Sequence, residues 1–286
     1  MMISNASRET DRLTKRLRQI AHVALDMDGT IYRGGTLFAV TNPFLEQLAE
    51  AGIGYSFLTN NSSKSTADYV RHLQSIGIPT NAAQIYTSTE ATIEFLREKM
   101  PAVRRLFVLG TSSMRVEVEA AGFILTGDSA DDAPDAVLVG FDMELCYARL
   151  CRAAYWIARD KPFLASHPDR ICPTDEPTVL VDCGSICAAL REATGKSPDA
   201  VLGKPDPRML HGLLHRHHLS VEALAMVGDR LYTDIAMAQS AGALSVLVLT
   251  GEATADEAKR HQPPPDVVVA DLGEFGQLLA MSQVDS

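Results

Sequence analysis

The sequence lacks any apolar run that approaches the roughly 18 residues expected of a membrane-spanning helix. We expect no secretory leader, because the N-terminal run from Arg8 to Leu13 mixes charges and includes no apolar segment. Cysteine is scarce: the five residues form an odd set without zinc-type spacing. Neither a disulfide framework nor a structural zinc site is therefore indicated. Together these absences predict a cytoplasmic protein with free thiols.

An excess of basic residues is missing too. Acidic residues outnumber basic ones by 36 to 26, which gives a net charge of −10. Wrapping nucleic acid or lying on an anionic membrane requires clustered Lys and Arg. We therefore expect neither a nucleic-acid polymer nor a membrane as a partner. An anionic small molecule is not excluded, because a metal ion and one lysine can make a local site cationic inside an acidic protein.

Short apolar runs that end in turn residues recur along the chain and are typical of strands buried on both faces. They cover residues 22–25, 55–58, 106–109, 136–139, 224–227, 245–249 and 267–269. Helical patterns lie between them, for example at 42–51 and 65–76, after a leading helix expected over 7–19. We expect an Asn-Pro cap for the first of these and a serine cap for the second. This alternation predicts an α/β fold with a Rossmann-like, doubly wound parallel sheet.

The middle of the chain carries strands and helices of its own, which indicates a second α/β unit inserted into the first. We expect the core to comprise residues 1–86 and 198–286, with an inserted α/β cap domain at 87–197. A chain of 286 residues is long enough for two such units.

Two aspartates follow directly on the first predicted strand, in the run Asp26-Met27-Asp28-Gly29-Thr30. Side chains at the carboxyl ends of parallel strands lie at the sheet edge where doubly wound folds bind ligands. Two carboxylates at positions i and i+2, turned by a glycine, can converge on one Mg²⁺ ion and one reacting group. The cation favours the ionised form of Asp26, which suits a nucleophile. Asp28 can more easily keep a proton and act as a general acid.

Polar groups suited to a phosphate lie in two further segments. Thr59, Asn60 and Asn61 close the second strand, and the helix that follows presents its N-terminus there. Lys204 stands between a glycine and a proline and can act as a fixed positive charge beside a phosphoryl group.

More acidic oxygen ligands follow a late strand. Asp229 closes the run at 224–227, and Asp234 comes five residues later. Each of the four segments is a weak signal by itself. Their order, and their positions at strand ends, predict one site for a metal ion and a phosphate.

The four segments together resemble the motifs of haloacid-dehalogenase-type hydrolases. The insertion between Thr59 and Lys204 is similar in size to the cap of the NagD-like, p-nitrophenylphosphatase-like branch. The runs at 86–88, 183–187 and 203–205 also resemble that branch. The resemblance covers the chain from about residue 20 onward.

The resemblance implies a Mg²⁺-dependent phosphatase that acts on a small phosphorylated metabolite, such as a nucleoside monophosphate or a sugar phosphate. It implies that Asp26 forms an aspartyl-phosphate, and that Asp28 protonates the leaving oxygen and then activates the hydrolytic water. Dehalogenases of the superfamily lack a carboxylate two residues after the nucleophile. The presence of Asp28 therefore favours phosphoryl transfer.

The resemblance also implies the residues that bind substrate and metal. Those that would bind the substrate phosphate are Thr59, Asn60, Asn61 and Lys204. Those that would bind Mg²⁺ are Asp26, Asp28 through its backbone carbonyl, and Asp229, with Asp234 in support. The cap would close over the core, exclude water and select the leaving group.

The chain departs from the family pattern in the cap, at Ser166-His167-Pro168-Asp169 and at Val181-Asp182. The resemblance implies that these positions face the leaving group. Two other functions stay open: a phosphotransferase or mutase that passes the phosphoryl group to an acceptor hydroxyl, and a catalytically silent phosphate-ligand-binding protein. A homodimer through the cap is also open.

Overall fold

The computed structural model describes residues 2–172 and 177–284. These residues form two compact units. The first unit takes the described residues within 1–58, 74–84 and 210–286, and the second takes those within 59–73 and 85–209. The predicted division into a catalytic core (residues 1–86 and 198–286) and a cap that covers the site (87–197) assigns a function to each segment. That division stays a prediction.

The first unit is built on a parallel sheet whose strands alternate with helices along the chain. Its strands are β1 (His22–Asp26), β4 (Gly54–Thr59), β13 (Leu224–Gly228), β14 (Leu244–Val248), β15 (Val267–Val269) and the short pair β2 (Tyr32–Arg33) and β3 (Thr36–Leu37). Its helices are α1 (Met2–Gln19), α2 (Thr41–Glu50), α8 (Arg208–His217), α9 (Ala236–Ala241), α10 (Ala255–Arg260) and α11 (Leu272–Val284). The short helical segments η1 (Ala82–Gln84), η2 (Val221–Ala223) and η3 (Leu231–Ile235) complete this unit, while most of helix α3 (Thr66–Ser75) belongs to the second unit.

The order of strands in this sheet is that of a doubly wound fold. Within the first unit, β15, β14, β13, β1 and β4 lie side by side in that order, and each neighbouring pair is parallel. From β1 the chain moves outward to β4 on one side, and later fills the other side with β13, β14 and β15. The direction of winding therefore reverses between β1 and β13, which defines the switch point of the sheet. The predicted α/β class with a parallel sheet is confirmed.

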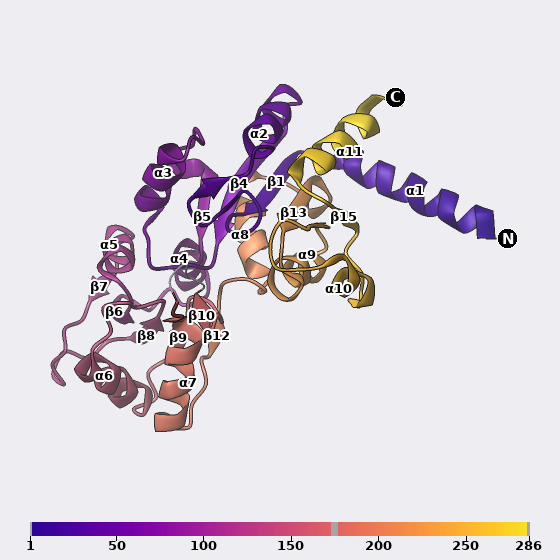
Figure 1. Cartoon of the computed structure of the whole chain (residues 1–286). Helices are drawn as coiled ribbons and strands as arrows, with labels where there is room; N and C mark the ends of the chain where they lie inside the picture. The colour runs from indigo at the N-terminus through magenta and orange to yellow at the C-terminus, as the bar shows by residue number, and fades with distance from the viewer. Residues whose placement is uncertain (1, 173–176, 285–286) are drawn as a thin grey trace. The chain divides into compact units, whose positions relative to one another are not determined.

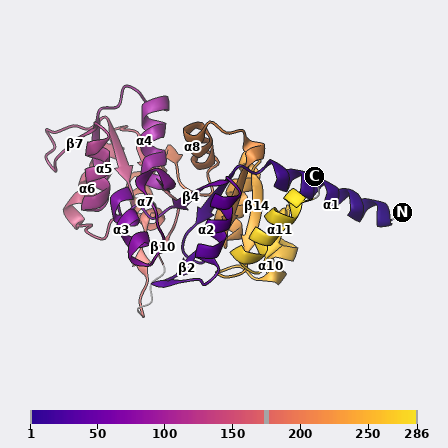
Figure 2. The same ribbon diagram turned by 90° about the horizontal axis from the view of Figure 1, so that it is seen from above.

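Helices cover both faces of this sheet, which explains why its strands are continuous apolar runs. Helices α2 and α11 lie together on one face, and α8 lies on the opposite face (Figures 1 and 2). Phe44 of α2 and Phe275 of α11 pack with ring centroids 5.9 Å apart. Between the two layers of helices, the residues of β1 from Val23 to Leu25 are fully buried.

Two helix starts test the predicted caps. Ser65 caps α3, because its Oγ accepts a hydrogen bond from the backbone N–H of Asp68, and Asp68 Oδ2 accepts from Ser65 N in return. The predicted Asn-Pro cap of α2 is wrong. That helix begins at Thr41 after Val40, which makes no side-chain cap. Asn42 instead donates to the carbonyl of Gly77.

The second unit has a parallel sheet of its own. The strands of this unit are β6 (Arg105–Leu109), β7 (Ile124–Leu125), β8 (Ala136–Val139), β9 (Phe163–Ala165), β10 (Ile171–Cys172), β11 (Leu180–Val181) and β12 (Ala200–Val201). The segment β5 (Ile85–Thr87) also falls within its residues but pairs with β4. The helices of this unit are α4 (Ser88–Lys99), α5 (Ser112–Ala120), α6 (Tyr147–Ile157) and α7 (Cys183–Thr194). The main sheet has the order β12-β9-β8-β6-β7, with every neighbouring pair parallel, while β10 and β11 form a separate antiparallel pair.

Alternate residues of the second sheet enter two different hydrophobic cores, as the twofold period of a strand requires. Leu106 and Val108 of β6 pack in the core that contains side chains of α4 and α5. Phe107 and Leu109 of the same strand pack in the core that contains side chains of α6 and α7. Figure 1 shows the two pairs of helices on opposite faces of this sheet. The strand is therefore apolar at consecutive positions because both of its faces are covered.

Two findings bear on the predicted environment of the protein. None of the five cysteines forms a disulfide: Cys183 and Cys187 are buried in the second unit, and the other three are at least partly exposed. In the part of the chain that the structure describes, no helix is both long and apolar enough to cross a membrane.

A buried histidine in the first unit, His22, packs against the partly exposed His217 and predicts acid sensitivity of the fold. His22 Nε2 lies 2.9 Å from Ser56 Oγ, and the His22 and His217 rings are 4.3 Å apart. Burial, followed by the charge of His217, lowers the pKa of His22 to about 4. Because the unfolded chain takes up this proton near its ordinary pKa of about 6.5, stability is complete above that pH and falls as the pH drops toward 4.

We expect the His22→Gln variant to lose less stability on acidification than the wild-type protein. Between about pH 7 and pH 5, the free energy of unfolding should fall by about 2 kcal/mol more in the wild type than in the variant, since one pKa unit corresponds to about 1.4 kcal/mol. Urea unfolding at the two pH values measures it. An equal loss of stability in the two proteins would show that His22 does not titrate on unfolding.

Candidate active site

Three aspartate side chains of the first unit converge at the carboxyl ends of two adjacent strands. Asp26 is the last residue of β1, Asp229 directly follows β13, and Asp234 lies in η3, which comes next. One carboxylate oxygen of each lies within 4.8 Å of the other two. These three residues are called the acidic cluster below. It lies at the switch point between β1 and β13, where doubly wound sheets bind their ligands.

The acidic cluster is buried to a degree that is rare for carboxylates. Asp229 is 2% exposed and Asp234 is 0% exposed. Burial, followed by the negative charges of Asp26 and Asp234, raises the pKa of Asp229 to about 7. A cation among the three carboxylates would offset this repulsion, so the arrangement favours a bound cation.

The hydrogen bonds of Asp229 point to the same conclusion. The backbone N–H of Glu252 donates to Asp229 Oδ2 at 2.7 Å. Among the described residues, no donor reaches the buried Asp229 Oδ1. A buried acceptor without a donor costs about 1–3 kcal/mol, and a metal ion beside this oxygen would remove that cost. Because hard divalent cations take carboxylate oxygens, the donor set of the acidic cluster fits such an ion.

Gly29 allows the turn after β1 to approach Asp229. Its φ angle of +86° lies in the left-handed region that L side chains rarely adopt. A Cβ atom at this position would lie 2.4 Å from Asp229 Oδ2. On the same turn, Asp28 is exposed and its Oδ1 accepts a hydrogen bond from Gly34 N at 3.2 Å. The sequence Asp-Gly thus does two things here: Asp28 presents an exposed carboxylate, and Gly29 lets the backbone approach Asp229 closely.

The second unit holds the residues predicted to bind phosphate. Thr59 is the last residue of β4, and its Oγ1 accepts a hydrogen bond from Asn61 N at 3.1 Å. Asn61 Oδ1 in turn accepts from the backbone N–H and the hydroxyl of Ser63, at 2.9 and 2.6 Å. These local bonds fix the turn that follows the strand.

Asn60 ties this turn to Lys204, which lies 144 positions away in the sequence. Asn60 Oδ1 accepts from the backbone N–H of Lys204 at 2.7 Å, and Asn60 Nδ2 donates to the carbonyl of Lys204 at 2.9 Å. A Cβ atom at Gly203 would lie 2.5 Å from Asn60 Oδ1, so only glycine permits this contact. Lys204 itself is 4% exposed. The side-chain amide of Asn60 therefore binds both the backbone N–H and the backbone carbonyl of Lys204.

The predicted site residues thus form two groups, one in each unit. The group in the first unit consists of Asp26, Asp28, Asp229 and Asp234. The group in the second unit consists of Thr59, Asn60, Asn61 and Lys204. That the two groups form one catalytic site stays a prediction.

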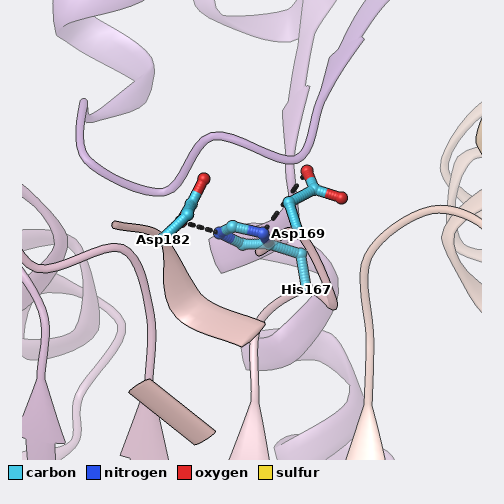
Figure 3. Close-up of side chains that lie close together, drawn as sticks. All are labelled: His167, Asp169 and Asp182. Carbon is cyan, nitrogen blue, oxygen red and sulfur yellow. Dashed lines mark ion pairs between the residues drawn. The ribbon is translucent and has the colours of Figure 1, made fainter. Parts of the chain in front are cut away.

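Sequence reasoning missed a second cluster of titratable side chains, in the second unit. Ligand atoms of His167, Asp169 and Asp182 lie within 4.8 Å of one another (Figure 3). The sequence marked these positions only as departures from a pattern. The available signal was a His-Pro-Asp run shortly after the buried strand β9, at a carboxyl strand end where polar side chains gather.

Two family models match the chain. Residues 23–124 match the model described as haloacid dehalogenase-like hydrolase, and residues 201–275 match the model described as HAD-hydrolase-like. The two matches cover the segments that carry Asp26, Asp28, Thr59, Lys204 and Asp229.

Curated proteins and solved structures show similarity along most of the chain. Chronophin of Rattus norvegicus is 32% identical over 252 residues, which cover 86% of this chain and 81% of that protein. The 4-nitrophenylphosphatase of Thermotoga maritima is 39% identical with a TM-score of 0.85, covering 92% of this chain and 98% of its own. A glycerol phosphate phosphatase of Mycobacterium tuberculosis, solved in complex with magnesium, is 31% identical with a TM-score of 0.83, covering 91% and 78%.

Proposed function

Because the chain belongs to the haloacid dehalogenase-like hydrolases, in their NagD-like, p-nitrophenylphosphatase-like branch, we propose that it hydrolyses a small phosphorylated metabolite through a covalent intermediate on Asp26. The observation that carries this proposal is the acidic cluster. Three carboxylates converge at a switch point, two of them are buried, and one has an oxygen that no described donor reaches; this arrangement supports a metal site that includes the proposed nucleophile.

The connectivity of the chain supports a single site made of both groups. In the first unit, Asp26 of β1 is in register with Leu58 of β4. Thr59 is the next residue along the chain, and Asn60 after it holds the backbone of Lys204 by two hydrogen bonds. Strand pairing, two peptide bonds and two hydrogen bonds thus connect the proposed nucleophile with the residues proposed to hold the phosphoryl oxygens, Thr59 and Lys204. Asn60 and Asn61 shape the turn between them.

In the proposed reaction, an oxygen of ionised Asp26 attacks phosphorus, and the bond from phosphorus to the ester oxygen breaks. Asp28 gives its proton to that leaving oxygen. Asp28 then takes a proton from water, which attacks the aspartyl-phosphate and releases inorganic phosphate and the free Asp26 carboxylate. Lys204 and Thr59 stabilise the charge on the phosphoryl oxygens throughout.

The metal that we propose is Mg²⁺, held by Asp26, Asp229 and the backbone carbonyl of Asp28, with Asp234 in support. When bound, it would offset the negative charge of the phosphoryl group and of the acidic cluster. Carboxylate and carbonyl ligands are those that Mg²⁺ prefers. The relative solved in complex with magnesium is consistent with this choice.

We further propose that residues 87–197 act as a cap that shields the site from water and selects the leaving group. The names of the relatives refer to p-nitrophenyl phosphate and glycerol phosphate. For this chain we propose a small phosphate monoester, with nucleoside monophosphates and sugar phosphates as the first compounds to test. A homodimer through the cap is part of the same proposal.

The proposal is tested with p-nitrophenyl phosphate in the presence of Mg²⁺ and, in parallel, of EDTA. We expect phosphate release with Mg²⁺ and a loss of at least about 10³-fold on chelation, because several kcal/mol of charge stabilisation are removed. Adding an acceptor alcohol separates hydrolysis from transfer. Phosphate found mainly on the acceptor would favour a phosphotransferase, and release under neither condition would favour a binding protein without turnover.

A further inference from the structure

The second unit encloses a histidine between two carboxylates. His167 follows β9, is 0% exposed, and lies with Nδ1 at 3.5 Å from Asp169 Oδ2 and Nε2 at 3.5 Å from Asp182 Oδ1. Figure 3 shows one carboxylate on each nitrogen edge of the imidazole ring. These three residues are called the His167 clamp below. Asp182 is also the N-cap of α7 and accepts a hydrogen bond from Cys183 N.

The two-sided geometry selects a charged ring. A neutral imidazole has one N–H and one lone pair, so one of the two carboxylates would face a lone pair. An imidazolium places a positive charge between the two carboxylates and compensates their buried charge. At 3.5 Å both contacts are ion pairs, and among the described residues Nδ1 has no hydrogen-bond partner. Burial opposes this protonation, but the negative charge of an ionised Cys183 and the two aspartates outweigh burial and raise the pKa of His167 to about 9.

A metal ion is the competing occupant of the clamp, because ligand atoms of its three residues lie within 4.8 Å of one another. We favour a charged ring because each of the two ring nitrogens forms an ion pair with a different carboxylate. Ser62 Oγ lies 3.4 Å from His167 Nε2 and adds a further polar contact on the Asp182 side.

A chain of hydrogen bonds leads from the clamp to Lys204. The oxygen of Asp169 that faces His167, Oδ2, also accepts a hydrogen bond from Asn60 Nδ2 at 3.1 Å. That same amide group donates to the carbonyl of Lys204, and Asn60 Oδ1 accepts from Lys204 N. The orientation of the Asn60 amide, and with it both bonds to Lys204, therefore depends on the Asp169 carboxylate.

Direct packing reinforces this chain. A Cβ atom at Gly203 would lie 2.7 Å from His167 Cβ, so the segment that carries Lys204 rests against the histidine. At the other side of the clamp, the backbone N–H of Gly184 in α7 donates to the carbonyl of Asp169 at 2.7 Å. The turn that bears His167 and Asp169 is thus fixed between α7 and the lysine segment.

We propose that His167 is a positioning residue for Lys204: as a cation between Asp169 and Asp182, it fixes the carboxylate that orients Asn60 and so the backbone of the lysine. The inference rests on the proposed function, because it takes Lys204 as a phosphate-binding group. The histidine itself touches neither substrate nor the acidic cluster in this proposal. Its effect reaches the substrate only through the lysine.

The test compares His167→Gln with the double variant His167→Gln/Asp182→Asn in the Mg²⁺-loaded protein. For His167→Gln we expect about a tenfold rise in KM for p-nitrophenyl phosphate and in the inhibition constant for inorganic phosphate, with kcat changed less than about threefold. Such a pattern is expected when an interaction made equally in the ground and transition states is lost. His211→Gln, which changes an exposed histidine of α8, is the matched control and should match the wild type.

The double variant separates positioning from simple support of the fold. Removing the second carboxylate should restore the melting temperature, because Asp182 no longer lies buried without a cation. Under our proposal the raised KM persists, because Asp169 still lacks its partner. The proposal would be overturned if both the melting temperature and KM returned to wild-type values in the double variant. It would also be overturned if His167→Gln left KM and phosphate inhibition unchanged. A second metal ion per chain that is lost with His167 would overturn it as well.

Direct binding of inorganic phosphate, measured by calorimetry, distinguishes a failure of the positioning role of His167 from a failure of the proposed function. Binding to the wild type that weakens about tenfold in His167→Gln supports positioning even if turnover proves slow. If the wild type neither binds phosphate nor hydrolyses phosphate esters, the proposed function and this inference fall together. Hydrolysis with unchanged phosphate binding in the variant overturns the inference alone.

Discussion

Replacing Asp26 with Asn is expected to lower turnover of p-nitrophenyl phosphate by about 10⁴-fold or more, the order of loss seen when a nucleophile that acts in concert with other groups is removed. The amide oxygen of Asn cannot form the acyl-phosphate bond that the proposed intermediate requires. The variant keeps the shape of the Asp26 side chain. The loss should therefore come from chemistry and not from packing.

The stability of Asp26→Asn offers an independent check. In the metal-free protein, the charge of Asp26 contributes to the raised pKa of Asp229. Removing that charge relieves repulsion in the acidic cluster, so the melting temperature without metal should stay the same or rise. Asp256→Asn, at an exposed position of α10, serves as the matched control and should leave turnover unchanged. Residual turnover above about 1% in Asp26→Asn would remove this residue as the nucleophile.

Replacing Asp28 with Asn is expected to separate the two halves of the reaction. Steady-state turnover should fall by about 10²–10⁴-fold, the usual contribution of a general acid–base. The first half should survive with p-nitrophenyl phosphate, because p-nitrophenolate leaves without protonation. Rapid mixing should then show a burst of about one p-nitrophenol per chain, followed by slow release of phosphate.

Mass spectrometry of the quenched Asp28→Asn protein should detect phosphate on Asp26. Asp28 is exposed and its carboxylate accepts only one hydrogen bond among those found for the described residues, from Gly34 N, so the substitution should disturb the fold little. An unchanged steady-state rate would exclude Asp28 from both proposed proton transfers. A complete loss without a burst would show that it is needed already in the first step.

Seven strands, β1, β4, β6, β8, β13, β14 and β15, could be predicted from the sequence because each is a continuous apolar run. The run at 224–227 became β13 (Leu224–Gly228), and the run at 245–249 became β14 (Leu244–Val248), each within one residue at either end. The start of α1 was placed five residues too late, at residue 7 in place of Met2. No apolar face or cap marks the beginning of that helix in the sequence, and helix ends are poorly specified where packing does not define them.

The contacts between distant segments could not be predicted. Asn60 follows a strand of the first sheet, yet its side chain bonds to Lys204 and its carbonyl accepts from Ser88 Oγ at 2.6 Å, so it groups with the second unit. The place of Asp234 likewise depends on tertiary structure, which brings one of its carboxylate oxygens within 4.8 Å of oxygens of Asp26 and Asp229. Sequence spacing carries no distance between residues that meet only through tertiary structure.

The His167 clamp is a second case in which contacts between residues apart in the sequence could not be predicted. His167 and Asp182 are separated by a pair of short strands, β10 and β11, and meet because α7 begins beside the turn after β9. Each residue by itself reads as an ordinary polar loop residue. Only their juxtaposition reveals a buried charge that needs compensation.

The place of β1 between β4 and β13 has a consequence for biosynthesis. Strands β1 and β13 pair although their residues stand roughly 200 positions apart, so closing this contact requires ordering a very long stretch of chain. As the polypeptide leaves the ribosome, Asp26 emerges early and Asp229 and Asp234 emerge late, after the whole second unit has been made. The three carboxylates are therefore brought together only at the end of synthesis, so a nascent chain carries Asp26 long before the acidic cluster can form.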